Sequence, residues 1–435
     1  MKDWKNIRIW RISAISLLLC LVVFICYMPI FSNGFLDSWD DQWMVMNVYT
    51  GSGWTWENLL AIFTQSHKGQ YSPLVELNYL FLYGLFGYNP FWFHLMSVVW
   101  HCGCVVLCFF LVRRLLELSG DINRSISFHV ACLVSFLFAI HPVNVESVAW
   151  ISAVKVPMYT FFYLLALFFY LHYTVTQKIS FYVISLFCFV CSGLSKEQAF
   201  VFPLSLLLVD WFILRDWKTM DIWLEKLPYL IVSIGFAFLT FDLQGNRSDA
   251  VSYTTVQRFL FGCYSLFEYI TKSLIPVNLN YLYPFPIPEG CVNIPVRFYV
   301  YPVLVAGLVV TLLYYRKNRI LLFGSLFFIL HLLLSLHIVA MPRLGIVADR
   351  YLYLSLIGLL LTVSYAFVVF VKKQRRRFAK ILCVLSLLLY STYLGLYTYQ
   401  YSMRWENTDT VKEYLRSFYK GELNENDIKS RDSHD

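Results

Sequence analysis

Ser38-Trp39-Asp40-Asp41-Gln42-Trp43 follows the first long apolar run of the chain and sets two adjacent carboxylates between two tryptophans. Tryptophan is enriched where the hydrocarbon of a bilayer meets water. Two neighbouring carboxylates at such a boundary repel one another, so the pair shares a proton, holds a cation or leaves one member as a base of raised pKa. The alternative is a pair of solvated loop acids. The stretch therefore suggests chemistry at a membrane interface.

The composition indicates that this interface belongs to a membrane protein. Hydrophobic residues make up 59% of the 435 residues and charged residues only 14%, and the mean hydropathy is +0.59. Soluble domains carry about 25% charged residues. We therefore predict an all-α polytopic membrane protein, and we attribute the net charge of +8 to basic residues on the cytoplasmic side, not to binding of nucleic acid.

Apolar runs long enough to cross a bilayer, roughly 17 to 25 residues, recur along the chain. We predict eleven spans, near 8–31, 91–112, 126–141, 156–174, 179–195, 197–214, 223–243, 298–315, 320–341, 351–371 and 380–399. A twelfth candidate, 257–276, carries Arg258, Glu268 and Lys272, so we interpret it as an interfacial or re-entrant helix. Segments 54–63 and 71–86 group their aromatic residues in the same way. Interfacial helices are thus expected in the first and fourth external loops.

The basic residues predict the orientation. With the N-terminus in the cytoplasm, the basic clusters at 316–319 and 372–380 also face the cytoplasm, as the positive-inside rule requires. Counting 257–276 as a span would move both clusters to the other face. The first external loop, 141–155, 195–197 and 348–351 then all lie on the outer or lumenal side. We expect residues 1–400 to form the membrane domain and 401–435 a short polar tail, helical from about 407 to 419.

Three further stretches bring polar groups to that side. His141, Asn144 and Glu146 lie next to Pro142, which ends a helix and can turn Asn144 and Glu146 toward one cavity. The alternative is that His141 and Asn144 only satisfy helix-end carbonyls. Lys196 and Glu197 stand between two apolar runs, where charges are costly unless they pair or function.

Asp349-Arg350-Tyr351 opens the tenth span, close to Arg343. An arginine here binds phosphate oxygens bidentately or reaches toward a lipid headgroup. Ten of the eleven cysteines lie in apolar stretches and Cys291 in a polar loop, so no disulfide framework or zinc spacing follows. The sequence contains no Walker, Rossmann, metal-helix or nucleophile-elbow motif. An ATP- or nicotinamide-driven reaction is therefore not supported.

Five motifs occur in an order that resembles a known family. They are SWDDQW (38–43), HPVNVESVAWIS (141–152), GLSKEQAFVFPLSLLLVDW (193–211), IPVNLNYLYP (275–284) and ADRYLYLSLIGL (348–359). Together they resemble the membrane part of the transmembrane and tetratricopeptide-repeat O-mannosyltransferases and their bacterial relatives. Those enzymes belong with the protein O-mannosyltransferases in the GT-C class. The resemblance extends from about residue 30 to about 415.

The resemblance implies an inverting transfer of a sugar from a polyprenyl-phosphate donor to a protein Ser/Thr or glycan hydroxyl on the periplasmic or lumenal face. It implies Asp40 as the base, with Asp41 assisting or holding a divalent cation, Mg²⁺ or Mn²⁺. The donor phosphate would face Lys196, Arg350, Arg343 and Lys155. The substrate pocket would include His141, Asn144, Glu146, Glu197, Asp349 and Tyr351.

The chain departs from the family pattern in two places. Bacterial relatives usually read Ser-Glu-Arg-Lys-Asp where this chain reads Ser152-Ala153-Val154-Lys155-Val156. Relatives often continue into tetratricopeptide repeats, of which only a start near 404–415 is visible, and this favours a bacterial inner membrane over the endoplasmic reticulum. A lipid-linked glycan flippase or transporter, an oligosaccharide polymerase or ligase, and an inactive relative remain alternatives.

Overall fold

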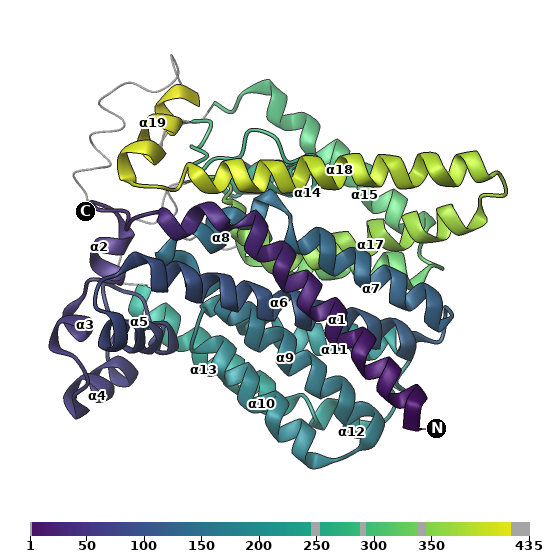
Figure 1. Cartoon of the computed structure of the whole chain (residues 1–435), viewed down its shortest axis with the longest axis horizontal. Helices are drawn as coiled ribbons and strands as arrows, with labels where there is room; N and C mark the ends of the chain where they lie inside the picture. Colours follow the sequence, from purple (N-terminus) through teal and green to yellow (C-terminus); the bar gives the residue numbers. More distant parts are fainter. Residues whose placement is uncertain (1, 245–252, 288–292, 338–344, 419–435) are drawn as a thin grey trace.

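The computed structural model describes residues 2–244, 253–287, 293–337 and 345–418, and its long helices run parallel or obliquely to the long axis of the molecule (Figure 1). The helices that lie over the predicted spans are α1 (Lys2–Cys26), α6 (Pro90–Ser119), α7 (Arg124–Ala139), α9 (Lys155–Thr176), α10 (Ile179–Gly193), α11 (Phe202–Phe212), α13 (Leu227–Gln244), α15 (Val300–Tyr314), α16 (Arg319–Leu332), α17 (Leu352–Lys373) and α18 (Arg377–Met403). The others are α2 (Asp40–Met44), α3 (Val48–Ser52), α4 (Trp56–Thr64), α5 (Pro73–Phe86), α8 (Val145–Ala149), α12 (Met220–Leu224), α14 (Thr255–Leu274) and α19 (Thr408–Phe418).

The lengths of these helices confirm an all-α, multi-pass membrane protein. Within the described ranges, six helical segments are long and apolar enough to cross a bilayer: Pro90–Ser119, Ile151–Thr176, Met220–Leu239, Val296–Tyr314, Asp349–Lys373 and Arg377–Met403. The pair Arg124–Ala139 and Pro142–Ala149, bent by 51°, forms a seventh if it is one span. The apolar parts of α1, α10 and α16 are shorter.

Capping residues mark where several of the long helices begin and end. Asn89, Asn123 and Asn318 each accept a backbone N–H bond in the first turn of the following helix, at α6, α7 and α16. Gly120 ends α6 with a positive φ of 71°, a conformation that glycine adopts without a Cβ penalty. The chain therefore reverses between α6 and α7 over only a few residues.

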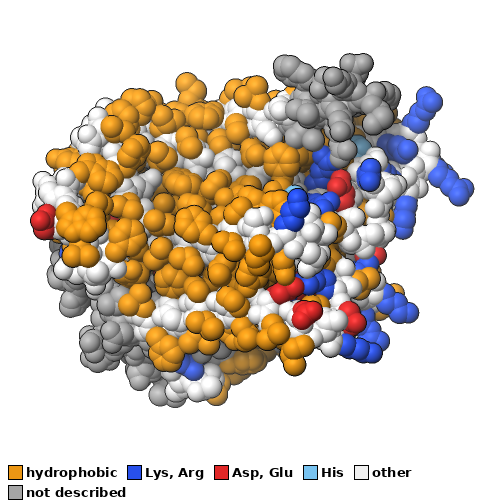
Figure 2. Space-filling model, turned by 90° about the horizontal axis from the view of Figure 1, so that it is seen from below, with side chains coloured by type: hydrophobic (Ala, Val, Ile, Leu, Met, Phe, Trp, Pro, Cys, Tyr) orange, Lys and Arg blue, Asp and Glu red, His pale blue; other side chains and the backbone are white. Residues whose placement is uncertain are grey.

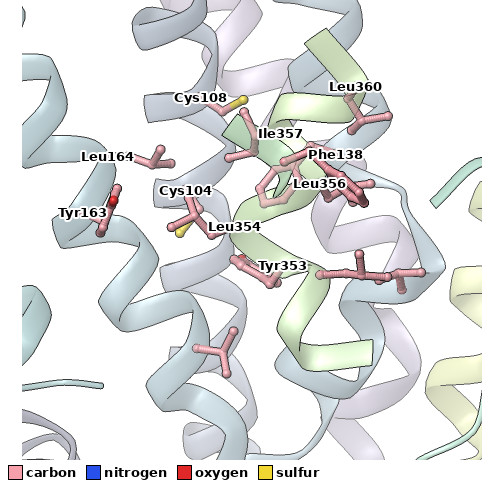
Figure 3. Packing of buried hydrophobic residues seen from close by; sticks show 14 of the residues in the cluster. Cys104, Cys108, Phe138, Tyr163, Leu164, Tyr353, Leu354, Leu356, Ile357 and Leu360 are labelled. Atoms are coloured by element: carbon pink, nitrogen blue, oxygen red, sulfur yellow. The ribbon is translucent and has the colours of Figure 1, made fainter. Parts of the chain in front are cut away.

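The core lies where α6, α7, α9 and α17 meet. Cys104, Phe138, Tyr163 and Leu354 point into this layer from the four helices (Figure 3). Nearby, α16 and α17 cross so closely that a Cβ on Gly324 would lie 2.6 Å from the carbonyl oxygen of Gly358. Small residues at such crossings let helices pack in a membrane without a hydrophobic driving force between them.

The helix over the twelfth candidate segment is amphipathic. Thr254 and Gln257 form a capping box at the start of α14, and Leu260 and Tyr269 bury one face. Phe259 is 61% exposed on the other face. This helix is not among the segments apolar enough to span, which agrees with the interfacial or re-entrant interpretation.

The two ends of the molecule differ in character. Helices α2 to α5 and α19 lie at one end, and the N-terminus and the turn between α17 and α18 lie at the other (Figure 1). Lys and Arg side chains gather at that second end, whereas much of the remaining visible surface is hydrophobic (Figure 2). The acid pair on α2 is therefore far along the molecule from the basic turn.

A buried ion network holds α9, α11 and the start of α13 together at the basic end. Asp210 is fully buried and forms an ion pair with Lys226. Tyr170 donates its hydroxyl to Asp210 Oδ1 at 2.9 Å. Arg215 binds Glu225 with one N–O distance of 2.7 Å and a second of 3.0 Å. The network therefore neutralises Asp210 inside the protein.

Replacing Lys226 by Met is expected to destabilise the protein, because buried Asp210 then keeps only its longer ion pair with Arg215, at 3.4 Å. Breaking such a pair from one side costs about 3–5 kcal/mol. Thermal unfolding in detergent measures the effect, with Lys218→Met, a change at an exposed lysine, as the control. The double variant Asp210→Asn/Lys226→Met should recover most of the loss. Equal stability of Lys226→Met and Lys218→Met would contradict the prediction.

Candidate active site

The acid pair divides into one buried and one partly exposed carboxylate. Asp41 is 1% exposed. Its Oδ2 accepts the backbone N–H of Leu36 at 2.9 Å, and its Oδ1 accepts both the N–H of Ser152, at 2.9 Å, and the Ser152 hydroxyl. Asp40 is only half-buried and accepts the indole N–H of Trp43 at 3.2 Å. Asp41 thus anchors the loop, while Asp40 stays partly accessible to solvent.

Burial raises the pKa of Asp41 from its ordinary value of 3.8 to about 6, and the hydrogen bonds from Leu36 and Ser152 only partly oppose this. The folded protein then binds this proton more tightly than the unfolded chain does. The contribution of Asp41 to the free energy of unfolding therefore falls as the pH rises through the interval from 3.8 to about 6. The carboxyl should be largely ionised at neutral pH.

We expect wild type to gain stability relative to Asp41→Asn as the pH is lowered from about 7 to about 5, because the variant lacks this titration. Unfolding temperatures of both proteins in the same detergent, at matched ionic strength, measure the difference. Asp37→Asn, at an exposed position of the same loop, should follow wild type. A wild-type advantage that does not change over this pH range would contradict the prediction.

Two basic residues from distant parts of the chain, Lys155 and Arg350, lie close enough to Asp40 to interact with it electrostatically, and Lys196 interacts with Lys155. Lys155 begins α9, Lys196 precedes the short helix Glu197–Val201, and Arg350 lies in the turn Asp349–Tyr351. Lys155 interacts electrostatically with Asp40, Lys196, Glu197 and Arg350, and Arg350 also interacts with Asp40. Tertiary structure therefore brings one partly exposed acid and three cations into one region.

Arg350 is held by a fully buried carboxylate. Its backbone N–H donates to Glu146 Oε2 at 2.7 Å, and its guanidinium binds Glu146 Oε1. The guanidinium carbon lies 5.8 Å from the ring centroid of Trp150 and 5.4 Å from that of Tyr351. Arg350 is still 28% exposed. An arginine fixed in this way keeps further N–H donors for an anion.

Further charged residues contact these groups or lie behind them. Lys196 Nζ lies 4.0 Å from Glu197 Oε1, and Lys196 is 6% exposed on its side chain against 41% for Glu197. Asp349 is buried and accepts the Tyr283 hydroxyl at 3.0 Å. Lys272 lies 4.0 Å from the centroid of the Tyr283 ring. Asp349 thus stands behind Arg350, away from the surface.

His141 and Asn144 lie inside the protein and bind backbone groups. His141 Nε2 lies 3.1 Å from the carbonyl oxygen of Ser273, and its Nδ1 accepts the N–H of Val143. Asn144 donates to the carbonyl of Phe138 at 2.8 Å. These contacts agree with the helix-end alternative for this motif, and the role of both residues in the substrate pocket stays a prediction. Arg343 lies outside the described residues.

The geometry of Asp41 does not fit the role of a cation ligand. Both of its oxygens accept protein N–H or O–H bonds in a buried position. In the ranges that the structure describes, no group of three or more His, Cys, Asp or Glu side chains could hold a metal ion. We therefore derive no step through a bound cation.

Several contacts at the site have no signal in the sequence. Ser152 binds Asp41 across 111 positions of sequence. Gln70 accepts a bond from Lys155 Nζ at 2.9 Å. Trp39 packs against Trp150 with ring centroids 6.1 Å apart. Ser152 and Trp150 do lie within the motif 141–152, shortly before Lys155 in sequence. The motif indicates that they lie near the site, but it does not indicate which side chains they contact.

Comparisons with known proteins identify distant relatives. No protein-family model matches the chain. The mouse protein O-mannosyl-transferase TMTC1 is 30% identical over 178 residues, 36% of this chain and 18% of that protein. A protein O-mannosyl-transferase of Caenorhabditis elegans is 25% identical over 241 residues, 53% of this chain and 32% of that protein. The matches thus span about a third or less of the length of these relatives.

Among solved structures, the archaeal oligosaccharyltransferase AglB from Archaeoglobus fulgidus aligns with 91% of this chain and 56% of its own, at a TM-score of 0.49 and 11% identity. The sequence matches are therefore the stronger evidence of kinship. By them, the chain is distantly similar to the protein O-mannosyl-transferases.

Proposed function

We propose that this protein is an integral-membrane, inverting glycosyltransferase of the GT-C class. It moves a sugar from a polyprenyl-phosphate donor to a hydroxyl of a protein Ser/Thr or of a glycan. The observation that carries the proposal is the convergence of partly exposed Asp40 with Lys155, Lys196 and Arg350 at one end of a membrane protein. Similarity to protein O-mannosyl-transferases supports the choice of reaction.

In the proposed reaction Asp40 is the general base. The acceptor hydroxyl gives its proton to the Asp40 carboxylate as its oxygen forms a bond to the anomeric carbon. The bond from that carbon to the phosphate oxygen breaks on the opposite face, so the configuration inverts. A positioned base of this kind contributes about 10²–10⁴ in rate. Asp41 holds the loop through Leu36 and Ser152 and takes no proton from the acceptor.

The leaving polyprenyl phosphate gains negative charge, which Lys155, Lys196 and Arg350 stabilise. Preorganised cations act most strongly in a site shielded from water, because the screening there is weak. Glu146 fixes Arg350 before the donor arrives. Since the donor carries a lipid chain, the site needs an opening toward the bilayer. The position of the site at the ends of the long helices is consistent with such an opening.

The eleven spans predicted from the sequence, if adopted, favour a periplasmic or lumenal site. Each predicted span contains a helix, and among the described residues six or seven helical segments are long and apolar enough to cross a bilayer. The basic residues gather at the end of the molecule opposite α2 (Figures 1 and 2). By the positive-inside rule the basic end faces the cytoplasm. The acid pair then faces the periplasm or the lumen, where donors linked to polyprenyl phosphate need no nucleotide.

A flippase or transporter is the main rival. Transporters usually place ionisable residues near the bilayer midplane, on broken helices. Here the cations stand at the ends of α9, α10 and α17, which favours the transferase. A lipid-linked glycan polymerase or ligase would use the same chemistry on another acceptor.

The test supplies membranes that contain the protein with a panel of labelled polyprenyl-phosphate sugars. Loss of donor together with label in protein or glycan supports the transferase, and the labelled product identifies the acceptor. Movement of an intact donor across reconstituted vesicles, without a new product, would support the transporter instead.

A further inference from the structure

We propose that residues 402–408, the C-terminal clamp, position the acid-bearing loop 33–41 for the transfer reaction. The clamp joins the end of α18 to the start of α19, about 370 positions after the loop in sequence. The inference rests on the proposed function for its catalytic consequence, but the contact between the two segments is a property of the fold alone.

Three hydrogen bonds connect the clamp to the loop. Asn33 donates its side-chain amide to the carbonyl of Ser402 at 3.1 Å. Gly34 donates its backbone N–H to the carbonyl of Glu406 at 2.8 Å. Thr408 donates its hydroxyl to the carbonyl of Asp37. The loop is thus bound along the residues that lead directly into Asp40.

A line of indole rings connects the clamp to the other side of the site. Trp405 is only 3% exposed and stacks on Trp150, with ring centroids 6.0 Å apart and an interplanar angle of 25°. Trp150 also packs against Trp39, which precedes Asp40, and lies under the guanidinium of Arg350. Trp405 therefore touches a ring that contacts both the acid loop and the phosphate-facing arginine.

The clamp is itself anchored by α19. Val411 and Leu415 are buried, and Tyr414 donates its hydroxyl to the carbonyl of Leu279 at 3.1 Å. Two residues further on, Tyr281 packs edge-on against Trp39 with ring centroids 4.5 Å apart. These contacts give the clamp a fixed position against which the loop can be held. A 1 Å displacement of a reacting group can cost about 10² in rate, so this restraint has a catalytic consequence. Trp405 is thus a positioning residue, not a catalytic one.

The first experiment measures amide hydrogen exchange of the full chain in detergent. Trp405→Ala should speed exchange across 33–41, on the order of tenfold, because local opening of the loop becomes less costly. Met403→Ala, at the last residue of α18, which is 49% exposed, is the matched control and should leave exchange unchanged. Exchange in α9 reports whether the variant is still folded.

Thr408→Val provides a second route if Trp405→Ala does not fold, since it removes only the hydroxyl bond to Asp37. It should also speed exchange across 33–41, whereas unchanged exchange there in a folded variant would overturn the proposal. With an active donor, Trp405→Ala should lower kcat by about 10-fold or more with a smaller change in donor KM, and Trp405→Phe should restore most of it. Faster exchange in a protein that turns over no donor would uphold the clamp and count against the proposed function alone.

Discussion

Asp40→Asn is expected to lower donor turnover by about 10²–10⁴ while leaving the protein folded. The amide has the shape of the carboxylate, and its oxygen can still accept the indole N–H of Trp43. It cannot take a proton from the acceptor hydroxyl. Initial rates with a labelled polyprenyl-phosphate sugar, at saturating donor, measure the effect.

The control for Asp40→Asn is Asp37→Asn, three residues earlier and exposed. It removes the same charge from the same loop and should keep nearly full turnover. Donor affinity should change little in Asp40→Asn, because the proposed role of Asp40 is toward the acceptor. Equal turnover by wild type and Asp40→Asn would remove Asp40 as the base.

The helices were predictable because their signals are local. Long apolar runs, Asn at helix starts and a charged amphipathic stretch at 257–276 each act within one segment. The helical pattern at 407–419 likewise corresponds to α19, Thr408–Phe418. The predicted short polar tail nevertheless includes Trp405, which packs deep against the membrane domain. A lone tryptophan in a polar stretch does not indicate which distant ring it will meet.

The charged residues of the site were predicted from their motifs, but the residues that they contact were not. Nothing local says that Ser152 binds Asp41, or that Glu146 holds Arg350 across 204 positions of sequence. The ring of His141 binds backbone at a helix end, a contact that its residue type did not indicate, and its place in the substrate pocket stays a prediction. Such pairings depend on tertiary packing, which periodicity does not report.

Arg350→Gln is expected to lower donor turnover by about 10²–10³, as loss of one preorganised donor to a developing anion does. The variant should also be less stable, because Glu146 is fully buried and loses its cation. Arg350→Lys keeps the charge without the planar fork, so it should fall between wild type and Arg350→Gln in turnover. Arg113→Gln breaks the pair with Glu117 on another helix and should leave turnover unchanged.

The double variant Glu146→Gln/Arg350→Gln separates the structural effect from the catalytic one. Without either charge the buried site has no uncompensated ion, so the unfolding temperature should return toward that of wild type. Turnover should stay low, because no guanidinium faces the leaving phosphate. Recovery of both stability and turnover would mean that Arg350 only neutralises Glu146, and the phosphate would then have to rely on Lys155 and Lys196. Recovery of stability alone would assign Arg350 to the donor phosphate, because the fold would then be intact and only the charge facing the leaving group would be missing.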